Sequence, residues 1–132
     1  LIHFGLTSED INSLAYALMI KKGIKIHLQK IKSLNNILKT YSNKWKNISF
    51  LAKTHGQAAS PSTLGKEIKV FSKRIELTQT AYESIKPLAK FSGATGNYHT
   101  FVTANNRIDW PLFNKRFLKS IDANNGILWT NS

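Results

Sequence analysis

The chain has 132 residues, a length that suits one domain, and its 42% apolar content is sufficient for a packed core. Its net charge is +12, from 19 Lys and Arg against 7 Asp and Glu. Cysteine is absent, which excludes disulfides and cysteine-based zinc sites. No apolar run approaches the roughly 20 residues of a membrane helix, and no segment has the pattern of a signal peptide. We therefore expect a soluble, cytoplasmic protein.

The positive charge has two interpretations. A basic surface can attract nucleic acid. Here 16 of the 19 basic residues are lysines, scattered from Lys21 to Lys119, and twelve asparagines accompany them. This composition favours a solvated basic surface, which would also attract small anionic substrates. We expect no nucleic-acid partner, and keep a basic helical nucleic-acid-binding module as an alternative.

Residues 10–45 predict one long helix. Its apolar side chains recur at spacings of three, four and seven, at Ile24, Leu28, Ile31, Leu38, Tyr41 and Trp45. Thr7, followed three residues later by Asp10, predicts a capping box at the start of this helix. Gly23 weakens the helical pattern without breaking it.

Residues 47–60 predict a loop, because their apolar stretch is short and broken. Ser60 and Pro61 then predict the start of a second helix over residues 61–85, with serine as the cap and proline in the first turn. Its apolar positions alternate in steps of four and three, at Leu64, Ile68, Phe71, Ile75, Thr78, Tyr82 and Ile85. Such a stripe predicts lengthwise packing against other helices.

Pro87 predicts the end of the second helix or a bend in it. Residues 91–103 hold two glycines and several threonines, which fits a turn region or a short β-ribbon. Residues 109–121 predict a shorter amphipathic helix, with Asp109 as its cap and Pro111 in its first turn. No element is predicted for residues 128–132.

The predicted fold class is all-α, a long-helix bundle that makes up a single partial domain over residues 1–132. Because the two apolar stripes are narrow, the two helices cannot bury each other completely. We therefore expect packing against partner chains as well.

Two segments carry candidate site residues. Residues 5–12 place the hydroxyls of Thr7 and Ser8 and several free backbone N–H groups at a helix start, where a carboxylate or phosphate can bind. A helix cap is the commoner explanation of such a segment. In residues 53–57, His55 follows Thr54 and precedes a glycine, which leaves room for a ligand. Histidine exchanges a proton near neutral pH.

The remaining candidates have simpler explanations. A lone histidine in a loop is more often structural than catalytic, and we assign a structural role to His3, His27 and His99. The segment Ser92-Gly93-Ala94-Thr95-Gly96-Asn97-Tyr98 is a weak phosphate-loop candidate, because no lysine follows it. We expect a structural turn there.

Taken together and in this order, three stretches resemble the adenylosuccinate lyase branch of the fumarase and aspartase superfamily. They are IHFGLTSEDIN at residues 2–12, KTHGQAASPSTLGKE at residues 53–67 and SGATGNY at residues 92–98. The resemblance covers nearly the whole chain. It implies a β-elimination that releases fumarate from adenylosuccinate, giving AMP, and from succinylaminoimidazole carboxamide ribotide. It also implies that no metal or organic cofactor takes part.

The resemblance assigns roles to four residues. His55 matches the catalytic histidine, usually the general acid; Thr7 and Ser8 match the pair that holds the succinyl carboxylate; Thr54 matches a residue at the same end of the substrate. The family base is a serine in a Gly-Ser-Ser…Met-Pro-Lys loop, and that segment is missing from this sequence.

The resemblance further implies a homotetramer whose active sites are shared between subunits. We expect the fragment alone to be nearly inactive; a sister lyase acting on argininosuccinate is a further alternative.

Overall fold

The computed structural model describes residues 3–122 and 126–130. The chain forms two compact units, one made of Leu1–Gly23 and Lys86–Ser132 and the other of Ile24–Ile85. We call them unit 1 and unit 2. A single long helix, α1 (Ser8–Lys44), contributes to both. No helix among the described residues is both long and apolar enough to cross a membrane.

The start of α1 shows half of the predicted capping box, in which the Asp10 side chain reaches back to Thr7 but the Thr7 hydroxyl does not accept from the Asp10 N–H. The Thr7 N–H donates to Asp10 Oδ2 at 2.9 Å, and the Asp10 N–H donates to the Thr7 carbonyl at 3.1 Å. The helix begins two residues before its predicted start and ends one residue before its predicted end. Gly23 does not interrupt it, as expected.

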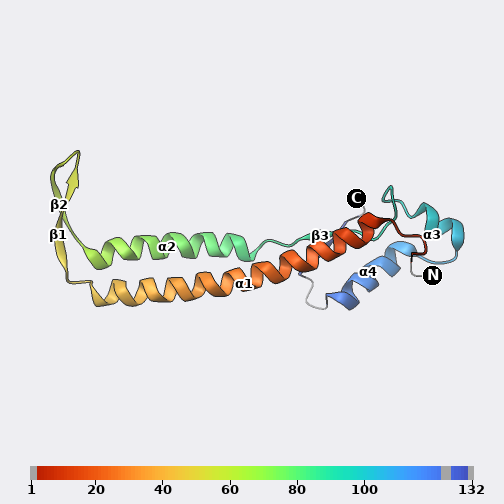
Figure 1. The fold of residues 1–132 in the computed structure, drawn as a ribbon, viewed down its shortest axis with the longest axis horizontal. Helices are drawn as coiled ribbons and strands as arrows, with labels where there is room; N and C mark the ends of the chain where they lie inside the picture. The colour runs from red at the N-terminus through yellow and green to blue at the C-terminus, as the bar shows by residue number, and fades with distance from the viewer. Residues whose placement is uncertain (1–2, 123–125, 131–132) are drawn as a thin grey trace. The chain divides into compact units, whose positions relative to one another are not determined.

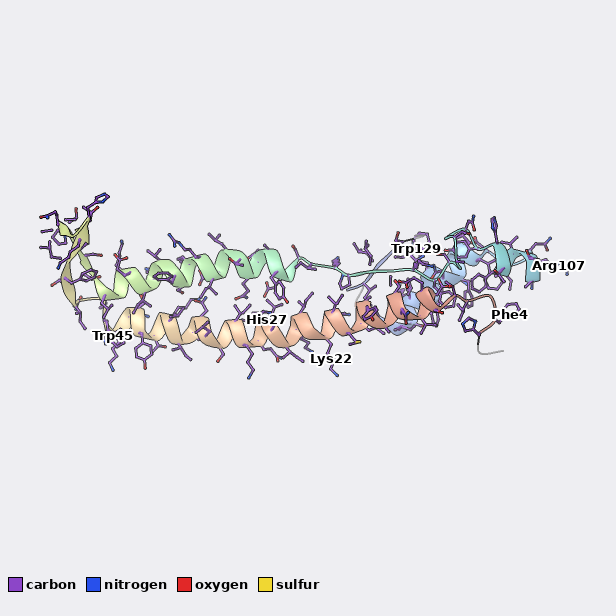
Figure 2. The ribbon with its side chains drawn as sticks, turned by 45° about the horizontal axis from the view of Figure 1, so that its top comes forward. Phe4, Lys22, His27, Trp45, Arg107 and Trp129 are labelled. Atoms are coloured by element: carbon purple, nitrogen blue, oxygen red, sulfur yellow. The ribbon has the colours of Figure 1, made fainter. Side chains whose placement is uncertain are left out.

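Unit 2 contains residues 24–44 of α1, a hairpin of two strands, β1 (Ser49–Thr54) and β2 (Gln57–Thr63), and a second helix, α2 (Leu64–Glu83). Within this unit, α2 runs beside α1 in the opposite direction, and the hairpin connects them (Figure 1). Side chains of the two helices are in contact: His27 of α1 lies on the side that faces α2 (Figure 2), where its ring meets Tyr82 edge-on at 5.4 Å between centroids. The two predicted long helices are therefore confirmed, and within this unit they run antiparallel.

The hairpin corrects the prediction for residues 47–60, which were expected to form a loop. β1 and β2 pair antiparallel, from Ser49 opposite Thr63 to Thr54 opposite Gln57. The expected helix start at Ser60 and Pro61 was also wrong, since both residues lie in β2. Instead, Thr63 is the cap of α2, and its Oγ1 accepts a hydrogen bond from the Lys66 N–H at 3.2 Å.

The contact face of α2 differs from the apolar stripe read from the sequence. Gly65 and Ser72 are its buried positions, whereas Phe71 is 59% exposed. A periodicity that counts only apolar residues misses this face, because small and polar side chains occupy part of it. At the edge of the helix pair, Glu76 contacts the ammonium groups of Lys39 at 2.6 Å and Lys73 at 2.7 Å. The hydrogen bond from Lys39, followed by that from Lys73, lowers the pKa of Glu76 to about 2.

Unit 1 holds two short helices, α3 (His99–Ala104) and α4 (Trp110–Ile121), and two short strands that pair in parallel, β3 (Leu88–Ala89) and β4 (Leu128–Trp129). The predicted third helix is confirmed as α4, and the Asp109 side chain accepts from the Leu112 N–H at 2.9 Å. The apolar core of this unit has two clusters: Leu14, Ala17, Ala89 and Leu118 in one, and Tyr98, Phe101 and Trp110 in the other.

Residues 91–103 form turns followed by α3, so of the two expectations for this segment the turn region is confirmed and the β-ribbon was wrong. Gly93 (φ 81°), Gly96 (φ 78°) and Tyr98 (φ 61°) have left-handed backbone conformations. Such conformations are incompatible with an extended strand. The strand β4 was not expected from residues 128–132.

Candidate functional site

His55 lies at the tip of the hairpin in unit 2. It and Gly56 are the two residues between β1 and β2, with φ values of 50° and 76°. Positive φ at both central residues is the pattern of the tight turns that best fit the twist of a hairpin. A non-glycine residue in this region costs about 1–2 kcal/mol, although histidine tolerates it better than most. Backbone strain of this kind is frequent at functional sites.

The surroundings of His55 leave its imidazole free. The side chain is exposed, and within the part of the chain that the structure describes it has no hydrogen-bond partner. Thr54 is the last residue of β1 and is also exposed. The hairpin therefore presents both side chains to whatever binds at its tip, and glycine next to the histidine keeps one approach open.

The base of the hairpin is anchored to the helices. Ser62 of β2 donates to Glu67 Oε1 at 2.6 Å, and this bond, with a second from Lys66, lowers the pKa of Glu67. The Ser42 hydroxyl of α1 donates to the Gly65 carbonyl at 2.8 Å. A Cβ added at Gly65 would lie 2.6 Å from the Lys46 backbone and would clash with the Ser42 carbonyl. Glycine at this position thus allows α2 to begin directly against the end of α1.

Thr7 and Ser8 lie at the start of α1 in unit 1. Thr7 is half-buried and precedes the helix, and Ser8 is its exposed first residue. Neither hydroxyl has a hydrogen-bond partner among the described residues. The first N–H groups of a helix are free donors and carry the positive end of the helix dipole. Together these groups can hold a carboxylate.

The structure brings the predicted site residues together in two pairs. Thr54 and His55 share the hairpin tip of unit 2, whereas Thr7 and Ser8 share the helix start of unit 1. A groove of about 340 Å³ between α1 and α2 has none of these four residues in its lining; it includes His27 and Tyr82. His27 Nδ1 lies 3.3 Å from the Tyr82 hydroxyl, which fits the structural role expected for this histidine.

Lys90 was missed in the sequence. It lies three residues before Gly93, the first glycine of the 92–98 segment, whereas the lysine of a phosphate loop follows its glycines. Its ammonium contacts the Asp10 carboxylate at 2.9 Å. Among the described residues, no group of three or more His, Asp or Glu side chains is arranged to hold a metal ion.

Comparison with known protein families gives a match over nearly the whole chain. The sequence pattern of the lyase family matches residues 1–124. The adenylosuccinate lyase of Buchnera aphidicola subsp. Schizaphis graminum is 42% identical over 129 residues, which are 97% of this chain and 27% of that protein. The adenylosuccinate lyase of Escherichia coli K12 is 37% identical over 129 residues, with the same coverage of 97% and 27%. The chain thus spans about a quarter of the length of these relatives.

Solved structures show a similar fold. The fumarate lyase from Mesorhizobium sp. BNC1 is 26% identical, with a TM-score of 0.76 over 89% of this chain and 27% of that one. The β-carboxy-cis,cis-muconate cycloisomerase from Acinetobacter calcoaceticus sp. ADP1 is 21% identical, with a TM-score of 0.75 over 97% of this chain and 28% of that one. These similarities confirm the predicted fold class.

Proposed function

Because the chain belongs to the lyase family, we propose that it forms part of an adenylosuccinate lyase. The observation that carries this proposal is the similarity of 97% of the chain to two adenylosuccinate lyases at 42% and 37% identity. The complete enzyme would split adenylosuccinate into AMP and fumarate. It would split succinylaminoimidazole carboxamide ribotide in the same way, in the formation of purine nucleotides.

The proposed reaction is a β-elimination. A base removes a proton from the carbon next to a carboxylate, and the resulting carbanion spreads its charge onto that carboxylate. The electron pair then forms the double bond of fumarate while the bond from carbon to the purine nitrogen breaks. A general acid protonates the departing nitrogen, which leaves the amine of AMP. The reaction needs two proton-transfer groups and a site for the carboxylates, and no cofactor.

We assign the general acid to His55. Its imidazole lies at the tip of a two-residue turn, exposed and without a partner among the described residues, so it is free to meet a substrate. The turn fixes the backbone on both sides of the histidine, which limits the positions that the ring can take. A group that gives a proton to a leaving nitrogen must be held within hydrogen-bond reach of it.

We assign carboxylate binding to Thr7, Ser8 and Thr54. The hydroxyls and free N–H groups at the start of α1 suit a carboxylate, and the helix dipole adds to its attraction. Thr54 lies next to the general acid in the hairpin and would contact the same end of the substrate. The net charge of +12 would draw the anionic substrate toward the protein.

The serine base would come from the part of the enzyme outside these 132 residues.

We propose that residues 1–132 form one partial domain of a cytoplasmic homotetramer, with active sites built from several subunits. Exposed apolar side chains support association: Phe71 is 59% exposed and Leu77 is 76% exposed. Light scattering on the complete enzyme should give the mass of a tetramer, and Phe71→Glu should shift it toward smaller species. A wild-type enzyme that stays monomeric at micromolar concentration would contradict the assembly.

The activity itself is tested by fumarate release from the complete enzyme. We expect release from adenylosuccinate and none from argininosuccinate; the reverse result would assign the chain to the sister lyase. The nucleic-acid alternative makes a different prediction, which is tight binding to DNA or RNA that weakens steeply with salt. Binding of that kind without any fumarate release would overturn the proposed function.

A further inference from the structure

A buried ion pair joins the start of α1 to the segment before α3. The Asp10 carboxylate is completely buried, with 0% exposed, and Lys90 Nζ donates to its Oδ1 at 2.9 Å. Lys90 is buried as well, with 11% of its side chain exposed, and its ammonium also donates to the Gly93 carbonyl at 2.8 Å. Because an isolated charge is costly to bury, each member of this pair depends on the other.

Three backbone N–H groups also converge on Asp10. The Thr7 N–H donates to Oδ2 at 2.9 Å, and those of Ser92 and Gly93 donate to Oδ1 at 3.0 and 3.2 Å. Burial by itself raises the pKa of Asp10, but the hydrogen bonds from Thr7, Lys90 and Ser92 outweigh it and lower the pKa below its usual value. The carboxylate is therefore ionised at neutral pH, and it fixes backbone from two segments that are distant in the sequence.

Apolar packing holds the same segment from another direction. Gly5 has a φ of 69°, and a Cβ added to it would lie 2.6 Å from the Phe101 ring. Phe101 belongs to the cluster of Tyr98 and Trp110, against which Leu6 also packs. The residues before α1 are thus fixed by packing at Gly5 and Leu6 and by hydrogen bonding at Thr7.

We propose that Asp10 is a positioning residue for the substrate carboxylate, acting through Thr7. The proposal rests on the proposed function, in which the hydroxyls of Thr7 and Ser8 hold the succinyl group. Asp10 accepts from the Thr7 N–H and leaves the Thr7 hydroxyl free for the substrate. Lys90 balances the negative charge that would otherwise repel a carboxylate bound at the helix start.

The first test is Asp10→Asn in the complete enzyme. An amide keeps the shape of the carboxylate, but its NH2 group cannot accept a hydrogen bond, so one of the converging N–H groups loses its acceptor. We expect the KM for adenylosuccinate to rise roughly tenfold, as for one weakened hydrogen bond to a charged group, while kcat changes much less. Glu9→Gln is the matched control, because Glu9 is the exposed neighbour of Asp10 in the same helical turn. It should leave KM unchanged.

The second test, Lys90→Met, keeps the three N–H groups on Asp10 and covers the case in which Asp10→Asn does not fold. The uncompensated carboxylate should raise KM, whereas Lys22→Met, at an exposed lysine of α1, should not. Because both residues act through one contact, the double variant should raise KM by less than the product of the single effects. Folded variants with reduced stability but wild-type KM would show that Asp10 is only structural. A wild-type enzyme that releases no fumarate would instead overturn the proposed function.

Discussion

Ser72 of α2 donates a hydrogen bond to Asn35 Oδ1 of α1 at 2.6 Å, and both side chains are buried. Ser42, seven residues after Asn35, makes a second buried polar contact between α1 and α2 through the Gly65 carbonyl. Polar groups buried between helices find their partners in one register, whereas apolar groups tolerate several. These two contacts therefore fix the alignment of α1 and α2 within unit 2. Because the hairpin that carries His55 connects the two helices, the contacts also fix where the hairpin begins.

Ser72→Ala should destabilise the protein by about 1–3 kcal/mol, because Asn35 Oδ1 then loses its donor in a buried environment. Urea unfolding followed by circular dichroism measures this change. Ser33→Ala, at an exposed position of the same helix as Asn35, is the control and should be nearly neutral. Adding Asn35→Leu to Ser72→Ala should recover part of the loss, because no polar atom is then left without a partner. Equal stability of Ser72→Ala and wild type would show that the hydrogen bond contributes nothing.

Two glycines should respond to alanine in opposite directions. Gly65→Ala should destabilise by about 1–3 kcal/mol or more, because its Cβ would lie 2.6 Å from the Lys46 backbone, which cannot easily move. At Gly23, in the interior of α1, an added Cβ would have no described atom within 4 Å apart from its chain neighbours and the backbone of its own helix. Gly23→Ala should stabilise by about 0.5–1 kcal/mol, since alanine is the better helix former. Thermal unfolding of the two variants measures both changes in stability. Destabilisation by Gly23→Ala would contradict this prediction.

The helices could be predicted from the sequence, but the hairpin could not. Ile24, Leu28 and Ile31 repeat with a helical period over a long stretch, which is the strongest local signal that a sequence carries. Both strands of the hairpin are mostly exposed within this chain, so no alternation of apolar and polar residues marks them. The turn is His55-Gly56 rather than the Asn-Gly or Asp-Gly pair that usually signals a hairpin.

For the candidate site, the sequence identified local groups but not long-range contacts. Thr7, Ser8, Thr54 and His55 could be named because they stand in recognisable motifs. Asp10 was expected only as a member of the capping box, which is a local role. Its contact with Lys90 joins residues 80 positions apart, and only the fold reveals it. The position of Ser72 between α1 and α2 was also missed, because it depends on a contact with a residue that is distant in the sequence.

The protein should lose stability at acidic pH, in part because Asp10 becomes protonated. Its folded pKa is lowered, so the ionised carboxylate favours the folded state. This contribution is complete above the unfolded pKa, about 4, and is lost as the pH falls through the folded value. The Asp10→Asn chain should be less stable than wild type at pH 6, and the difference should shrink below about pH 4. Urea unfolding at pH 6, 4 and 3 measures it, and a difference that is the same at all three pH values would contradict this prediction.

Substitutions of His55 test its proposed role as the general acid. In the complete enzyme, His55→Ala should lower kcat by roughly two to four orders of magnitude, the range for loss of one acid–base group. KM should change far less, because the histidine acts mainly on the leaving nitrogen in the transition state. Alanine, however, also removes a residue that tolerates the φ of 50° at this position, so the turn itself is perturbed.

His55→Asn separates these two effects. Asparagine adopts left-handed backbone conformations readily and preserves the hairpin, but it cannot give up a proton near neutral pH. If His55 is the general acid, both variants should lose activity to a similar extent, although His55→Asn keeps the wild-type stability. Mixing His55→Asn enzyme with enzyme that lacks the serine base should restore part of the activity, since sites shared between subunits would then include some with both groups intact. Full turnover by purified His55→Asn protein would show that another residue protonates the leaving nitrogen.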